Sequence, residues 1–196
     1  MSIKLYLGPM WSAKTSKLIQ EYQKWHCIGK PTLVINHKID DRYGMDNYLY
    51  THDQVKIPCT SVQRLSEIDY KIIEQCEAIF INEGQFFDDL KDKCLEWCEQ
   101  YGKHIYIVGL DGDRFRQKFG QVLDLIPYAD HYEKLLAKCK MCLDGTAACF
   151  TYDQSVNDCN QQIIVGNEQY LPLCRKHYLG GRIVVPLDPL TLVSSR

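Results

Sequence analysis

Residues 8–15, Gly-Pro-Met-Trp-Ser-Ala-Lys-Thr, have the composition and spacing of a loop that binds phosphate groups. The general pattern is G-x-x-x-x-G-K-S/T, in which backbone N–H groups surround the phosphates, the lysine reaches the β- and γ-phosphates and the hydroxyl binds Mg²⁺. Lys14 and Thr15 match the last two positions, but Ala13 stands where the pattern has its second glycine. If that position needs a positive φ, the Cβ of Ala13 costs about 1 kcal/mol or more. The alternative is a chance match in a tight turn between a strand and a helix.

A second candidate lies at residues 78–85, where the apolar run Ala-Ile-Phe-Ile leads into Asn-Glu-Gly-Gln. Open α/β sheets bind their ligands at the carboxyl ends of the strands. Glu83 is the only acid among the last four residues. A carboxylate there can orient Mg²⁺ or accept a proton from an attacking hydroxyl, and phosphoryl transfer needs such groups beside a phosphate-binding loop.

Two residue pairs near the end of the chain have the spacing of metal ligands. Cys139 and Cys142 form a C-x₂-C pair, and Cys174 and His177 form a C-x₂-H pair. Two such pairs predict a closed Cys₃His tetrahedron around Zn²⁺. The alternative is two redox-active or incidental pairs. The chain has ten cysteines and no recognisable secretion signal, so we expect reduced thiols and metal ligands in an intracellular protein.

Short apolar runs and helical patterns alternate along the first two thirds of the chain. Residues 3–7, 32–35, 78–81 and 105–110 predict strands buried in a parallel sheet. Residues 14–29 and 88–101 carry apolar side chains on helical spacing, with Cys94 and Cys98 expected in the core. The alternation predicts an α/β doubly wound fold with the phosphate loop between the first strand and the first helix.

The last third of the chain has a different texture. From Cys139 onward, cysteine pairs and polar turns replace the apolar runs, and only residues 162–165 suggest a short strand. This segment has too little apolar mass for an independent core, so we expect a metal to hold it together. We therefore divide the chain into a nucleotide-binding core at residues 1–136, a zinc-binding domain at 137–182 and a tail at 183–196.

Charge and hydropathy narrow the class of partner. Of the 196 residues, 45% are hydrophobic and the formal net charge is −2, which fits one or two soluble domains. A near-neutral chain gives no broad basic face for nucleic acid and no polybasic segment for a membrane. No run approaches the roughly 18 apolar residues of a membrane helix. We expect a cytoplasmic protein that acts on a small partner.

The candidate segments also include five short strings that occur in a characteristic order. The strings are Gly8-Pro9-Met10, Asp40-Asp41-Arg42-Tyr43, Thr51-His52-Asp53, Glu83-Gly84-Gln85-Phe86-Phe87 and Leu110-Asp111-Gly112. On these strings the chain resembles the type II thymidine kinases, the tetrameric zinc-containing enzymes of animal cytosol, bacteria and large DNA viruses. The resemblance extends from about residue 3 to residue 178.

The resemblance implies both a fold and a reaction. The fold would be a P-loop, RecA-like, doubly wound and mostly parallel sheet with a small zinc-bound lasso domain. The reaction would transfer the γ-phosphate of ATP to the 5′-hydroxyl of thymidine, with Mg²⁺ as cofactor and Zn²⁺ in a structural role. The expected assembly is a homotetramer that acts in the cytoplasm, with no nucleic-acid or membrane partner.

Residue roles follow from the same resemblance. Glu83 would take the proton from the 5′-hydroxyl, while Lys14 and Arg42 would neutralise charge on the phosphates. Asn82 stands where the family usually has an aspartate associated with Mg²⁺, and an amide can hold a metal-bound water without adding negative charge. Thr15 and Asn82 are thus the expected Mg²⁺ ligands. The four zinc ligands coincide with the family's, with His177 where cysteine is commoner.

The implied binding residues fall into two groups. The expected ATP-binding residues are Gly8, Pro9, Met10, Trp11, Ser12, Ala13, Lys14, Thr15, Asp40, Arg42, Asn82 and Gln85. The expected substrate-binding residues are Met10, Glu83, Phe86, Leu110, Phe115, Phe119, Ile163, Ile164, Val165, Gly166 and Tyr170. The family's substrate-stacking phenylalanine falls on Arg114 by direct counting, and we assign its role to Phe115, one residue later. Residues 161–166 would form the lasso that closes over the nucleoside.

Three alternatives remain open at this stage. The chain could be a paralogue that binds nucleotide but has weak or no kinase activity, because Ala13 and Asn82 both lie on the phosphate side of the site. It could be a P-loop ATPase with a zinc ribbon that acts on nucleic acid. The nucleoside substrate could also be deoxycytidine or another deoxynucleoside.

Overall fold

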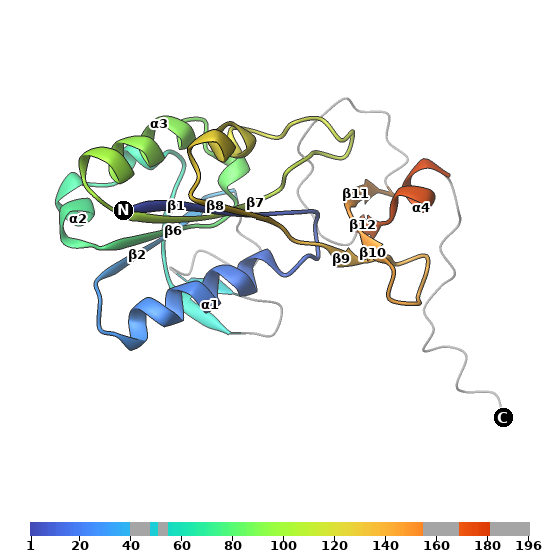
Figure 1. Cartoon of the computed structure of the whole chain (residues 1–196), viewed down its shortest axis with the longest axis horizontal. Coiled ribbons are helices and arrows are strands. Elements are labelled where there is room, and N and C mark those ends of the chain that lie inside the picture. Colours follow the sequence, from blue (N-terminus) through green and yellow to red (C-terminus); the bar gives the residue numbers. More distant parts are fainter. Residues whose placement is uncertain (40–47, 51–54, 155–168, 181–196) are drawn as a thin grey trace.

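A sheet of parallel strands forms the centre of the molecule (Figure 1). The computed structural model describes residues 1–39, 48–50, 55–154 and 169–180. Six described strands join in the order β5-β2-β6-β7-β1-β8, and every pairing between them is parallel. The strands are β1 Ser2–Leu7, β2 Thr32–His37, β5 Thr60–Val62, β6 Ala78–Ile81, β7 His104–Gly109 and β8 His131–Lys134.

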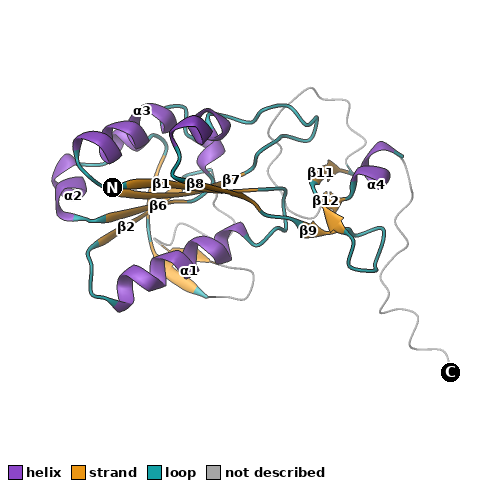
Figure 2. Cartoon of the chain, viewed as in Figure 1, coloured by secondary structure: helices purple, strands orange, loops and turns teal. Residues whose placement is uncertain are grey.

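Helices cover both faces of this sheet, as Figures 1 and 2 show. Helix α1, Lys14–Cys27, lies on one face, and α2, Tyr70–Gln75, and α3, Leu90–Leu95, lie on the other. The last turn beyond α3 is π-helical, η3 at Glu96–Gln100. The predicted α/β doubly wound fold is therefore confirmed, with the predicted helices near 14–29 and 88–101 in place.

Two apolar layers fill the spaces between the sheet and its helices. Alternate residues of β1 enter opposite layers, because successive side chains of a strand point to opposite faces. Ile3 and Leu5 join the layer under α3, which also buries Cys94 and Cys98 as expected. Tyr6 joins the layer that holds Leu18, Ile19 and Tyr22 of α1. The sheet is thus buried on both faces, which explains why its strands read as continuous apolar runs.

Several short elements were not predicted. Strands β5 and β8 extend the sheet at its two edges, and β3, Tyr48–Tyr50, pairs antiparallel with β4, Lys56–Pro58. Each has only three or four residues, too few to show a period of two clearly. The 3₁₀ turns are η1 Leu65–Glu67, η2 Gly84–Phe86 and η4 Val122–Tyr128.

A small unit lies beyond the carboxyl ends of the central strands (Figure 2). It contains two antiparallel strand pairs and a short helix, and a separate apolar cluster lies between them. The predicted strand at 162–165 and the tail at 183–196 lie outside the described residues. The elements of the unit are β9 Ala137–Lys138, β10 Ala147–Ala148, β11 Phe150–Asp153, β12 Tyr170–Leu173 and α4 Arg175–Leu179.

Among the described residues, no helix is both long enough and apolar enough to cross a membrane.

Candidate functional site

The phosphate-loop segment connects the carboxyl end of β1 to the first turn of α1. Gly8 begins it, and its backbone N–H donates to the carbonyl of Gly109 at the end of β7 over 3.2 Å. A Cβ on Gly8 would lie 2.3 Å from the carbonyl oxygen of Leu135. Real Cβ atoms do not approach an oxygen so closely, so the loop can start here only with glycine.

Two residues of the loop have left-handed backbone conformations. Ala13 has a φ of 58° and Trp11 a φ of 66°. Such conformations cost an ordinary residue roughly 1–2 kcal/mol. The second glycine of the general pattern is therefore at a position that needs a positive φ, and Ala13 occupies it at a cost. The loop is strained at two residues in a six-residue stretch.

The polar side chains of the loop converge on one carbonyl. Lys14 Nζ donates to the backbone oxygen of Pro9 over 2.6 Å, and Ser12 Oγ donates to the same oxygen over 2.8 Å. Both side chains belong to buried residues. The ammonium group is thus held over the loop, where incoming phosphate oxygens could exchange with the carbonyl.

Thr15 and Asn82, the residues expected to hold Mg²⁺, lie against each other. Thr15 Oγ1 donates to Asn82 Oδ1 over 3.4 Å, and Asn82 Nδ2 donates to Asn36 Oδ1 over 2.9 Å. Asn82 is only 1% exposed. The bond to Asn36 fixes the amide so that its oxygen faces the loop. A hydroxyl and an amide oxygen are hard oxygen donors that suit a largely hydrated Mg²⁺, so the site fits the ion.

Glu83 follows Asn82 and is held by a neighbouring glutamine. Its backbone is left-handed, with a φ of 51°. Gln85 Nε2 donates to Glu83 Oε2 over 2.6 Å, and Gln85 Oε1 accepts from the backbone N–H of Leu110 over 3.0 Å. A Cβ on Gly120 would lie 2.1 Å from the carbonyl oxygen of Gln85, so the chain packs tightly around this glutamine. Gln85, expected at the nucleotide, thus contacts the candidate base directly.

The aromatic residues expected at the substrate are only partly brought together. The rings of Phe86 and Phe119 meet at right angles with centroids 5.5 Å apart. The centroid of the His37 ring lies 5.6 Å from that of Phe86. Phe115, by contrast, is 48% exposed. Its ring is covered by the guanidinium of Arg114, 4.7 Å from the centroid.

Arg114, which direct counting aligned with the family's stacking phenylalanine, has a different partner. Its guanidinium forms an ion pair with the carboxylate of Asp153 in β11, and both side chains are 7% exposed. Tyr178 of α4 donates its hydroxyl to the Arg114 carbonyl over 2.6 Å. Burial raises the pKa of Tyr178, so the hydroxyl keeps its proton for this bond. No local pattern indicates this pairing, because Arg114 and Asp153 are 39 positions apart in the chain.

The phosphate loop itself contacts the small unit. Met10 donates its backbone N–H to Thr151 Oγ1 of β11 over 3.0 Å. Trp11 donates its indole Nε1–H to the carbonyl of Tyr170 in β12, also over 3.0 Å. Sequence reasoning missed Thr151 entirely. It placed Trp11 and Tyr170 at different substrates, whereas the structure joins them.

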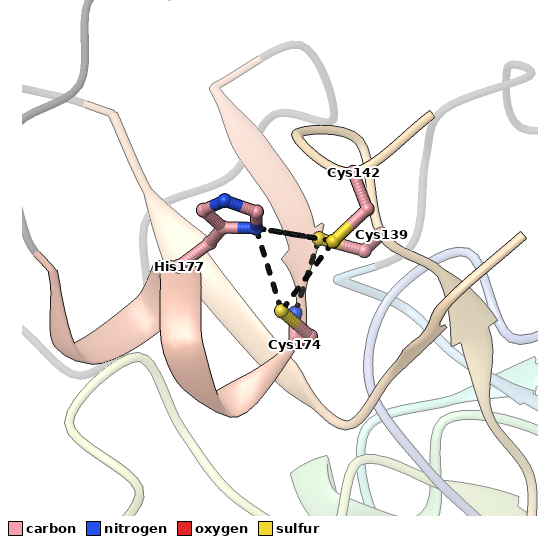
Figure 3. Close-up of side chains that lie close together, drawn as sticks. All are labelled: Cys139, Cys142, Cys174 and His177. Atoms are coloured by element: carbon pink, nitrogen blue, oxygen red, sulfur yellow. Dashed lines mark hydrogen bonds between the residues drawn. The ribbon is translucent and has the colours of Figure 1, made fainter. Parts of the chain in front are cut away.

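The four predicted zinc ligands converge in the small unit (Figure 3). Cys142 Sγ lies 3.8 Å from Cys174 Sγ, and the three sulfur atoms lie 3.3–3.5 Å from His177 Nδ1. Tetrahedral Zn²⁺ would place sulfurs about 3.8 Å apart and a sulfur about 3.5 Å from a nitrogen. The spacing therefore fits zinc. The ligand atoms of Cys139, Cys142, Cys174 and His177 all lie within 4.8 Å of one another.

The thiols of this cluster compete for ionisation. Burial raises the pKa of the Cys139 thiol, but hydrogen bonds led by the backbone N–H of Cys174 lower it to about 6. Burial, together with the neighbouring thiols, raises the pKa of Cys142 to about 11. A divalent cation would stabilise both thiolates, because zinc binds cysteine in its deprotonated form.

Some expected site residues lie outside the described part of the chain. They are Asp40 and Arg42 on the phosphate side and Ile163, Ile164, Val165 and Gly166 on the nucleoside side. The remaining expected residues occupy the segments that follow β1, β6 and β7, including the first turn of α1, or the small unit.

The chain is similar to one family model and to several known proteins. A family model described as thymidine kinase matches residues 1–178. A thymidine kinase of Oryza sativa subsp. japonica is 38% identical over 195 residues, which cover 97% of this chain and 70% of the relative. Thymidine kinase a of Arabidopsis thaliana is 34% identical over 99% of this chain and 82% of its own. The thymidine kinase of Yaba monkey tumor virus is 37% identical, over 90% and 93%.

Proposed function

The chain belongs to the thymidine kinase family, and from this premise we propose that it transfers the γ-phosphate of ATP to the 5′-hydroxyl of thymidine to give thymidine monophosphate. As a kinase of this family it uses ATP and a metal ion. The observation that carries the proposal is the contact of Thr15 with Asn82. It brings the residue before Glu83 against the phosphate loop, so a candidate base lies beside the candidate phosphate site.

The transfer would use few protein groups. Lys14 and the N–H groups of the loop bind and orient the triphosphate, and Arg42 neutralises charge on it. Thr15 and Asn82 would hold Mg²⁺, which when bound offsets the charge of the phosphate oxygens. Glu83 takes the proton of the 5′-hydroxyl as that oxygen bonds to the γ-phosphorus. The bond from phosphorus to the bridging oxygen breaks, and ADP leaves.

The nucleoside would lie between the two parts of the molecule. We assign its contacts to Met10, Phe86, Leu110 and Phe119 in the core and to Tyr170 in the small unit, with Phe115 and residues 163–166 completing the set. The hydrogen bonds of Gln85 to Glu83 and Leu110 support this assignment, because they connect the proposed general base, Glu83, to the end of β7.

The same proposal divides the chain by function. Residues 1–136 would bind nucleotide, residues 137–182 would form the zinc-bound substrate domain, and residues 183–196 would form a tail. The separate apolar cluster around Cys139 and Leu173 supports this division. Zinc would be structural here, since four protein ligands leave no open position. By family resemblance we also propose a cytoplasmic homotetramer without nucleic-acid or membrane partners.

One assay tests the reaction and the base together. Purified protein is incubated with ATP, Mg²⁺ and thymidine, and thymidine monophosphate is measured, with Lys14→Ala as the inactive reference. Glu83→Gln should abolish turnover but leave the Kd of a non-hydrolysable ATP analogue unchanged. Glu99→Gln, an exposed glutamate on η3, is the matched control and should keep full activity.

The possible outcomes separate the candidate functions. Full activity of Glu83→Gln would show that another group is the base. Phosphorylation of a different deoxynucleoside in a substrate panel would correct the substrate alone. Tight ATP binding without any phosphorylated nucleoside would indicate a nucleotide-binding paralogue, and ATP hydrolysis stimulated by DNA would indicate a nucleic-acid ATPase.

A further inference from the structure

The phosphate loop has two strained residues, and the small unit holds the loop at two neighbouring points. Trp11 and Ala13 both have positive φ. Met10 donates to Thr151 Oγ1, and Trp11 donates to the Tyr170 carbonyl. One of the two bonds is made by a strained residue and the other by the residue before it. The loop is thus supported at the place where its own backbone is least favourable.

A strained backbone persists only when its surroundings over-determine it. The described side-chain hydrogen bonds within the loop run from Ser12 and Lys14 to the Pro9 carbonyl. Neither of these two bonds involves the backbone of Met10 or Trp11. The bonds to β11 and β12 fix the N–H direction of Met10 and the ring position of Trp11. Together they specify a conformation that an alanine in place of glycine would otherwise disfavour.

The supporting groups are themselves firmly placed. Thr151 is 6% exposed and Tyr170 is 8% exposed. Their strands are paired in register, with Asp153 opposite Tyr170 and Thr151 opposite Pro172. Cys174, a zinc-ligand candidate, follows directly after β12. The two strands therefore form a short rigid support between the metal cluster and the phosphate loop.

We propose that Thr151 and Trp11 are positioning residues for the nucleotide, through which the β11–β12 strand pair holds the phosphate loop in its binding conformation. The loop binds phosphates through its backbone N–H groups, so their orientation sets the affinity. The small unit then acts on ATP as well as on the nucleoside. This inference rests on the ATP-binding half of the proposed function and is independent of the nucleoside.

Two consequences distinguish positioning from general stability. Loss of either bond should weaken ATP binding while the small unit keeps its metal. The dependence of ATP affinity on these bonds should also shrink when the strain is relieved, because Gly at position 13 adopts a positive φ freely. Ala13→Gly should therefore make the loop less dependent on Thr151.

The experiment measures the Kd of a non-hydrolysable ATP analogue with Mg²⁺ by calorimetry, without nucleoside. Thr151→Val removes the acceptor at constant shape, and Thr151→Ser keeps it. Trp11→Phe removes the indole donor and keeps a ring. We expect Thr151→Val and Trp11→Phe each to raise the Kd about 3- to 10-fold, the range for loss of one hydrogen bond. Thr151→Ser should stay within about twofold of the unchanged protein.

The double variant Ala13→Gly with Thr151→Val completes the test. Adding Thr151→Val to Ala13→Gly should raise the Kd by a smaller factor than Thr151→Val raises it in the chain with Ala13. Zinc content and unfolding temperature are measured for every variant to verify that the small unit is intact. An unchanged Kd for Thr151→Val, an equal loss for Thr151→Ser, or full additivity with Ala13→Gly would overturn the proposal. Failure to phosphorylate thymidine would leave these binding results intact and count only against the nucleoside assignment.

Discussion

Gln85 Nε2 donates a 2.6 Å hydrogen bond to Oε2 of Glu83, and the other end of the same amide accepts the backbone N–H of Leu110. Gln85 is 3% exposed, so water competes little for either bond. The amide therefore fixes one carboxylate oxygen of Glu83. Because it also contacts the end of β7, it sets the distance between the candidate base and the loop that follows Leu110.

We expect Gln85→Leu to lower kcat by roughly tenfold or more, since a hydrogen bond to a charged group contributes about 1.5–3 kcal/mol. The Kd of an ATP analogue should change little, because the phosphate loop keeps its contacts. Gln121→Leu is the matched control, as Gln121 bridges Lys91 and Asp88 in the same manner away from Glu83. Equal losses of kcat in the two variants would mean that Gln85 supports the fold and not the carboxylate.

Zinc should be required for the small unit to fold. Its apolar cluster is small, and structural zinc contributes folding free energy directly. We expect one zinc per chain by atomic absorption, and loss of metal with a lower unfolding temperature in His177→Ala. His177→Cys should keep the metal, because thiolate and imidazole are equivalent ligands for a tetrahedral site. His131→Ala, an exposed histidine of β8, is the control. A full equivalent of zinc in His177→Ala would contradict the ligand assignment.

Much of this architecture could be predicted because it depends on local patterns. Strand β6 is four consecutive buried apolar residues, and the two cysteine-containing pairs each place two ligands within one turn. The sequence predicts strain at Ala13 if the second glycine position needs a positive φ, and the structure has a φ of 58° there. These features are each encoded within about eight residues.

The remaining features depend on contacts between distant segments. Nothing near Thr151 indicates that its hydroxyl accepts from Met10, because the two residues are 141 positions apart. The same holds for Arg114, where alignment by counting suggested a stacking position and the fold supplies Asp153 instead. Strand β8 pairs with β1 although its sequence, His-Tyr-Glu-Lys, has no apolar run. Edge position explains that composition, since one side of an edge strand faces solvent.

Asp89 should make the stability of the core depend on pH. Its carboxylate accepts the backbone N–H groups of Leu65 and Ser66 over 3.0 and 2.9 Å. Burial alone would raise the pKa of Asp89, but these bonds lower it below the ordinary value of 3.8. A lowered pKa in the folded state adds stability that is complete above about pH 4 and is lost as the pH falls through the folded value.

Asp89→Asn should therefore reduce the free energy of unfolding most at neutral pH, and the difference should narrow below about pH 4. Urea unfolding at several pH values measures it. Asp88→Asn, whose side chain is 66% exposed and pairs with Arg64 at the surface, should have an effect of about 1 kcal/mol or less. A constant difference between Asp89→Asn and the unchanged protein from pH 7 to pH 3 would show that the charge of Asp89 is irrelevant.

The buried ion pair of Arg114 with Asp153 joins the loop after β7 to β11. The losses of stability on replacing each partner should therefore not add up in the double variant. Removing one charge leaves the other buried without compensation, which costs about 3–5 kcal/mol. Arg114→Met and Asp153→Leu should each destabilise the protein by that amount, whereas the double variant should cost less than either. Lys118→Met and Asp124→Leu, at an exposed pair, should each cost about 1 kcal/mol or less. Denaturant unfolding gives all five values, and additive losses at Arg114 and Asp153 would show that the two side chains do not act as a pair. The KM for thymidine should rise in both single variants while the KM for ATP changes less, because the joined loop follows Leu110 on the nucleoside side of the proposed site.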